Sequence, residues 1–121
     1  MKLKNVLIVV NDIERSRQFY RSLFGLDVIL DSGGNVVLTE GLVLQEASVW
    51  QKETGQEILF QNHASELYFE ESDIDGFIKK LENFPDAIEY VTRPTKLPWG
   101  QTLIRLYDPD KNLIEIGRAH V

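Results

Sequence analysis

Apolar residues along the chain follow two spacings, one typical of strands and one typical of helices. Short runs rich in Val, Leu and Ile predict strands at residues 3–10, 26–30, 36–39 and 42–45. After the first run, Asp12 is a favourable N-cap, apolar side chains recur at helical spacing from Ile13, and Gly25 is a suitable helix end. The first part of the chain therefore predicts one strand, one helix and three strands.

The same order recurs in the second part of the chain. Strands are predicted at residues 66–70, 88–92, 103–107 and 113–117, with a loop at 93–100. A helix capped by Asp73 has its apolar side chains at helical spacing and ends at Pro85. Asp12 and Asp73 are 61 residues apart, and the same shift carries Asn5 onto Glu66. A duplicated unit follows from this repetition.

The segment between the two rounds has a weaker pattern. It allows a short helix around residues 48–53 and a strand around 57–61. We expect an α+β protein with two βαβββ modules, at about 1–47 and 65–121, joined by this linker segment. The 121 residues suffice for a single domain that spans 1–121.

Composition excludes several classes of protein. The chain has no cysteine, so thiol catalysis, disulfides and thiolate metal sites are excluded. The formal net charge of −6 disfavours a nucleic-acid-binding surface, which needs clustered Lys and Arg. No apolar run approaches the roughly 20 residues of a membrane span. We expect a soluble cytoplasmic protein with no nucleic-acid or membrane partner.

One carboxylate occupies an unusual place in the pattern. Glu115 lies inside the apolar run at 113–117, directly after the turn that begins at Asp108. An acid in an apolar strand is costly to bury unless another group pairs with it. Glu115 is therefore a candidate functional residue.

Two stretches of the sequence resemble a known superfamily. The first runs from Asp12 through Leu26, and the second contains Trp99, Arg105, Asp108 and Glu115. Together they resemble the vicinal oxygen chelate superfamily, which includes glyoxalase I, fosfomycin-modifying enzymes, extradiol dioxygenases and bleomycin-binding resistance proteins. The resemblance implies that the two βαβββ modules form a cup-shaped mixed sheet.

The resemblance also implies a set of metal ligands on the first and last strands of each module. Carried over by position, these are Asn5, Gln45, Glu66 and Glu115, with Glu46 as the alternative to Gln45. Strand alternation places Asn5, Glu66 and Glu115 on the same surface. The cofactor would be a divalent metal, Ni, Mn, Mg, Co or Zn, or none. Without metal, these groups would form a polar hydrogen-bonded cluster in which one carboxyl holds a proton.

Three further residues are candidates for substrate binding. Tyr68 shares the face of Glu66 and could donate a hydrogen bond, and Trp99 lies in a loop that could cap the site. Arg105 could pair with an acidic residue of the site, bind an anionic substrate, or form a surface salt bridge. His63 and His120 are outside the expected ligand positions, and we expect both to be exposed.

Two functions are compatible with the resemblance. The first is a glyoxalase-like, divalent-metal-dependent lyase or isomerase, of the lactoylglutathione lyase type, that acts on a small oxygenated substrate and uses Glu66 or Glu115 as its catalytic acid or base. The second is a metal-free protein of the bleomycin-resistance type that sequesters a small molecule, and its acidic lining would suit a cationic drug. The resemblance further implies a homodimer in which Asn5 and Gln45 of one chain meet Glu66 and Glu115 of the other.

Overall fold

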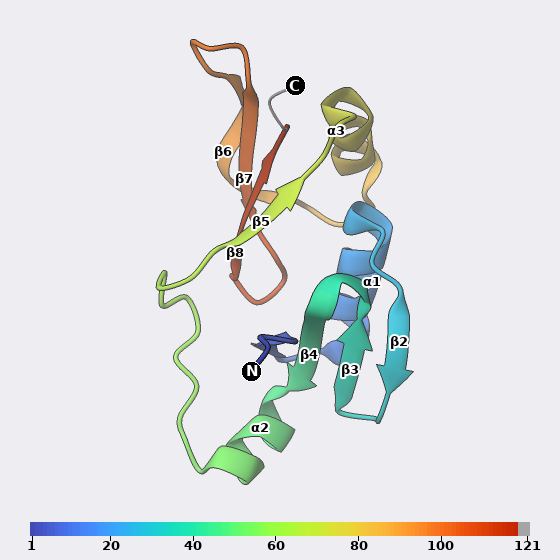
Figure 1. The fold of residues 1–121 in the computed structure, drawn as a ribbon, viewed down its shortest axis with the longest axis vertical. Coiled ribbons are helices and arrows are strands. Elements are labelled where there is room, and N and C mark those ends of the chain that lie inside the picture. Colours follow the sequence, from blue (N-terminus) through green and yellow to red (C-terminus); the bar gives the residue numbers. More distant parts are fainter. Residues whose placement is uncertain (119–121) are drawn as a thin grey trace. The chain divides into compact units, whose positions relative to one another are not determined.

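The computed structural model describes residues 1–118. The chain divides into two compact units, of which the first is Met1–Leu59 and the second begins at Phe60. Each unit contains one four-stranded sheet (Figure 1). The expected modules at 1–47 and 65–121 fall within these units, and most of the expected linker belongs to the first one. His120 lies outside the described residues.

The first unit has the expected strand–helix–strand–strand–strand order, with one more helix at its end. Its elements are β1 (Val6–Val10), α1 (Ile13–Phe24), β2 (Val28–Asp31), β3 (Asn35–Leu38), the 3₁₀ turn η1 (Thr39–Gly41), β4 (Leu42–Glu46) and α2 (Ala47–Thr54). The strand order is β1-β4-β3-β2, with β1 parallel to β4 and the other pairs antiparallel. Asp12 caps α1 by accepting the Arg15 backbone N–H, and Gly25 ends it at a φ of 66°.

The second unit repeats this plan. Its elements are β5 (Leu67–Glu70), α3 (Ile74–Asn83), β6 (Glu89–Lys96), β7 (Thr102–Tyr107) and β8 (Leu113–Gly117). The strand order is β5-β8-β7-β6, with β5 parallel to β8 and the other pairs antiparallel. Asp73 caps α3 by accepting the Gly76 backbone N–H, as the sequence predicts. The predicted fold class, α+β with two βαβββ modules, is confirmed.

Each sheet has one apolar buried face, and in the first sheet β4 is buried on both faces over residues 42–45. In the first unit Val36 and Leu44 are buried side by side on neighbouring strands, and α1, with its buried Tyr20 and Leu23, packs against β4. In the second unit four residues of β7 and β8 are almost inaccessible, namely Ile104, Leu106, Ile114 and Ile116. Because side chains alternate along a strand, the residues between these four lie on the opposite face.

Two predictions about individual segments are wrong. Residues 57–61 form no strand, and the chain from Gly55 to β5 is irregular (Figure 1). Residues 93–96 are not part of a loop, because β6 continues through Pro94 to Lys96. Proline is tolerated there since β6 is an edge strand and its pairing with β7 is interrupted by bulges. No helix among the described residues is long and apolar enough to cross a membrane.

Candidate functional site: an acid–arginine cluster on the second sheet

Three strands of the second sheet bring a row of functional side chains together. Tyr68 on β5 is paired in register with Glu115 on β8, which is paired with Arg105 on β7. All three therefore lie on the face opposite the buried isoleucines. Glu66 directly precedes β5 and, by alternation, shares the face of Tyr68. We call Glu66, Tyr68, Arg105 and Glu115 the polar face.

The guanidinium of Arg105 contacts both carboxylates. Its Nε lies 3.5 Å from Glu66 Oε1, and one terminal nitrogen lies 3.7 Å from Glu115 Oε2. The three side chains keep 23–34% of their surface exposed, so water still reaches them. Both distances exceed those of a hydrogen bond, and partly exposed ion pairs of this kind contribute little to stability.

The surroundings of Glu115 raise the pKa of its carboxyl group. Burial raises its pKa, and a hydrogen bond with Glu66 and the negative charge of Glu66 raise the pKa further. The positive charge of Arg105 acts in the opposite direction. The raised pKa shows that the neighbouring Glu66 and partial burial disfavour the ionised form of the Glu115 carboxyl group, while Arg105 favours it.

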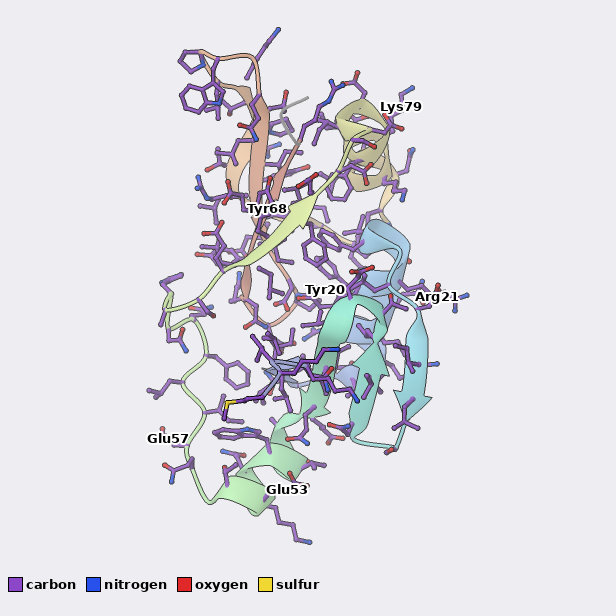
Figure 2. The ribbon with its side chains drawn as sticks, in the orientation of Figure 1. Tyr20, Arg21, Glu53, Glu57, Tyr68 and Lys79 are labelled. Carbon is purple, nitrogen blue, oxygen red and sulfur yellow. The ribbon has the colours of Figure 1, made fainter. Side chains whose placement is uncertain are left out.

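Tyr68 and Trp99 are exposed aromatic side chains of the second unit. Tyr68 is 52% exposed on β5 (Figure 2), and Trp99, in the turn between β6 and β7, is 62% exposed. The Trp99 indole N–H donates to Gln101 Oε1 at 3.1 Å, and the Gln101 amide donates to the Arg118 carbonyl at 2.8 Å. These bonds tie Trp99 to the end of β8, so the turn presents a positioned aromatic ring.

Sequence reasoning missed Gly117 and Gln101. A Cβ built on Gly117 would lie 2.8 Å from the Tyr68 hydroxyl oxygen and 3.4 Å from Gln101 Nε2. Gly117 therefore leaves the room that the Tyr68 side chain occupies. A glycine inside a strand is itself a sign of such a close approach. His63 is exposed, as expected, and its Nε2 lies 2.8 Å from the hydroxyl oxygen of Tyr107 on β7.

The first unit does not bring its two candidate ligands together. Asn5 is exposed, precedes β1 and lies beside Gly41, whereas Gln45 pairs with Val9 at the far end of the strand. Four residues of strand separate them by about 13 Å. Gln45 is buried, and its amide donates to Asn35 Oδ1 at 3.1 Å.

Neither the alternative ligand, Glu46, nor the strand register provides a metal ligand equivalent to Glu115 in the first unit. A carboxylate oxygen of Glu46 accepts the Ser48 hydroxyl. The parallel strand pairs of the two units have the same register, with Leu42 beside Val6 in the first and Ile114 beside Leu67 in the second. One residue further along, Val43 is therefore the equivalent of Glu115. The first unit thus has an apolar side chain at the place that Glu115 occupies in the second unit, and neither Gln45 nor Glu46 lies there.

The donor set of the second unit does not fit a divalent cation. Among residues 1–118, no group of three or more His, Asp or Glu side chains is placed to hold a metal ion. The two carboxylates of the polar face contact each other and Arg105. A metal ion would have to displace the guanidinium from both carboxylates, since the positive charge of Arg105 occupies the place beside them.

The repeated βαβββ architecture defines a protein of the glyoxalase fold type. The chain belongs to the Glyoxalase-like domain family, which it matches over residues 3–120. No curated protein matches its sequence.

Solved structures agree with this assignment. A protein of unknown function from Agrobacterium tumefaciens strain C58 is 29% identical, with a TM-score of 0.83 over 99% of this chain and 95% of that one. A glyoxalase/bleomycin resistance protein/dioxygenase from Nocardioides is 20% identical, with a TM-score of 0.72 over 98% and 83%. The fosfomycin resistance protein FosX from Mesorhizobium loti is 15% identical, with a TM-score of 0.71 over 99% and 93%. The resemblance to the vicinal oxygen chelate superfamily is thereby confirmed.

Proposed function

We propose that this glyoxalase-like protein binds a small organic molecule on the polar face of its second unit without a divalent metal. The observation that carries the proposal is the contact of Arg105 with both Glu66 and Glu115. The guanidinium supplies the positive charge that a metal ion would otherwise supply to these carboxylates. The partly exposed polar groups and the exposed rings of Tyr68 and Trp99 offer both hydrogen bonds and apolar contact to a ligand.

The position of Arg105 weakens the expectation, based on the acidic residues, that the ligand is cationic. An acidic lining alone would suit a cationic drug, whereas here the guanidinium of Arg105 lies beside both carboxyl groups and offsets part of their negative charge. A cationic ligand therefore gains less from this face than the acidic residues alone imply.

Metal analysis tests the proposal directly. The purified protein is assayed by elemental analysis and then titrated with Mg, Mn, Ni, Co and Zn, alongside Glu66→Gln and Glu115→Gln. We expect no stoichiometric metal in the wild type, and we expect Arg105→Gln to bind metal more tightly than the wild type because it frees both carboxylates. Stoichiometric wild-type binding that both glutamine variants abolish would contradict the proposal and support the metal-dependent lyase or isomerase.

The raised pKa of Glu115 favours a second candidate function. A carboxyl group that holds its proton closer to neutral pH is suited to general acid–base chemistry. In that case Glu115 would transfer a proton to or from a bound substrate, and Arg105 would orient the Glu115 carboxyl group. A lyase and isomerase substrate screen with Glu115→Gln as the control tests this candidate, and turnover unchanged in the variant would exclude Glu115 from the chemistry.

The homodimer implied by the family resemblance stays a prediction. Light scattering on the dilute protein measures the mass, and a monomer would exclude any site that needs Asn5 or Gln45 of a second chain.

A further inference from the structure

The guanidinium of Arg105 retains hydrogen-bonding capacity. An arginine side chain carries five N–H donors. Within residues 1–118, Arg105 makes only the two contacts at 3.5 and 3.7 Å with Glu66 and Glu115, and no hydrogen bond from its side chain to another described residue is found. One third of the side chain is exposed. Arg105 is thus held in place by charge and has donors left for a ligand.

Acceptors lie directly beside these donors. Glu66 and Glu115 keep 32% and 23% of their side-chain surface exposed, so their oxygens can still accept from an incoming group. The polar face therefore presents a donor and an acceptor within about 4 Å of each other. A ligand group that complements both must carry an acceptor and a donor on neighbouring atoms.

This arrangement penalises ligands with a full charge. A cationic head group would approach the carboxylates but also the guanidinium, and an anionic head group would approach the guanidinium but also two carboxyl groups. Each charged ligand would meet a like charge in a partly desolvated place. A neutral group with a carbonyl next to an N–H avoids both penalties.

A flat apolar surface adjoins the donor and acceptor. Tyr68 is the register partner of Glu115, and its side chain extends over Gly117, which has no side chain to lift it. More than half of Tyr68 is exposed. An aromatic ring attached to the ligand's head group can stack on this side chain.

We propose that the polar face recognises a neutral amide-type group, an amide, lactam or urea, attached to a planar ring. Its carbonyl oxygen accepts from Arg105, its N–H donates to Glu66 or Glu115, and its ring lies against Tyr68. This inference rests on the proposed function, because it names the ligand class of the same site.

Three probes with the same ring and different head groups test the inference. Benzamide is neutral with a donor and an acceptor, benzoate is anionic, and benzamidine is cationic. Each is titrated into isotope-labelled protein, and NMR follows the Arg105 Nε–H and the backbone amides of β5, β7 and β8. We expect benzamide to bind roughly tenfold more tightly than either charged probe, the difference associated with one hydrogen bond to a charged group.

The chain offers a matched control for the key residue. Arg105→Met should remove the preference for benzamide, and Arg105→Lys should weaken it, because an ammonium group lacks the planar fork of donors. Arg93→Met removes an arginine of the same sheet that lies over the Tyr90 ring, outside the polar face, and should leave all three affinities unchanged. Arg105→Lys also guards against a methionine variant that fails to fold.

The outcomes separate the two proposals. Benzoate or benzamidine binding to the polar face as tightly as benzamide would overturn the amide preference and leave metal-free binding intact. No shift on β5, β7 or β8 with any probe up to its solubility limit would overturn the amide inference. Stoichiometric metal in the wild type, measured separately, would overturn the proposed function.

Discussion

The two units share one backbone plan but carry different chemistry on one face of their sheets. Their strand registers coincide when Val6 is matched to Leu67 and Leu42 to Ile114. The buried faces are then equivalent and apolar in both, with Val36, Leu42 and Leu44 in the first unit and, in the same order, Ile104, Ile114 and Ile116 in the second.

The opposite faces differ at the same backbone positions. In the first unit they hold Leu7, Val37 and Val43, and in the second unit Tyr68, Arg105 and Glu115. The apolar face is constrained by packing in both units. On the opposite face Val43 is also buried, whereas Arg105 and Glu115 are partly exposed, so the two units differ there in chemistry and in exposure. The duplicated fold is therefore a common scaffold, and the candidate site belongs to the second unit alone.

The equivalence of the buried faces predicts the largest effects. Leu44→Ala and Ile116→Ala truncate matched side chains that are 0% and 1% exposed. Each should lower the free energy of unfolding by about 2–5 kcal/mol, because each leaves a cavity in a packed sheet. Urea unfolding measures the loss. A loss below about 1 kcal/mol in either variant would show that the two buried faces do not contribute equally.

A second pair of matched positions should give unequal effects. Gln45 and Gly117 occupy equivalent places on β4 and β8, but Gln45 is buried and bonded to Asn35, while Gly117 lies beneath Tyr68. Gln45→Ala should cost about 1–3 kcal/mol, since it removes a buried side chain and leaves the half-buried Asn35 oxygen without its donor.

Gly117→Ala should cost less than about 1 kcal/mol, because the new Cβ displaces the end of an exposed side chain rather than backbone. It should nevertheless weaken benzamide binding by moving Tyr68. Urea unfolding and the NMR titration together check the pair. Full benzamide affinity in Gly117→Ala would show that the position of Tyr68 is irrelevant to binding.

The smallest predicted effect is a pH dependence confined to the second unit. The pKa of Glu115 is raised in the folded state above its ordinary value of 4.5, so folding opposes its ionisation. Its contribution to stability is complete below pH 4.5 and is lost as pH rises through the folded-state pKa. The wild type should therefore lose stability relative to Glu115→Gln over this window.

Thermal unfolding of both proteins from about pH 4 to pH 8 measures that difference, and the other titrating groups cancel in the comparison. Val43→Gln, at the equivalent place of the first unit, serves as the control and should show the wild-type pH dependence. Parallel curves for the wild type and Glu115→Gln would contradict the raised pKa.

Local sequence signals predicted most of the elements and one face of the second sheet. The caps at Asp12 and Asp73 and the helix end at Gly25 depend on neighbouring residues, and the structure has all three. Alternation along single strands was enough to place Glu66 and Tyr68 on one face and to separate Glu115 from its apolar neighbours. These features need no knowledge of which strands pair.

The features that depend on strand pairing were not predictable in the same way. The shift between equivalent residues is 61 from β1 to β5 but 72 from β4 to β8, because β6 is longer than β2 and the connecting turns also differ in length. A single shift therefore could not show that Val43 is the partner position of Glu115. The contact of Arg105 with two carboxylates likewise depends on the register of three strands.

The most direct test of the central claim maps ligand binding onto both sheets in the absence of metal. Isotope-labelled protein is treated with a chelator and titrated with benzamide, and backbone amide shifts are compared at equivalent positions of the two units. We predict shifts around Tyr68, Arg105 and Glu115 and none around Leu7, Val37 and Val43. Shifts on the first sheet alone, or binding that requires added Ni or Mn, would contradict a metal-free site on the second unit.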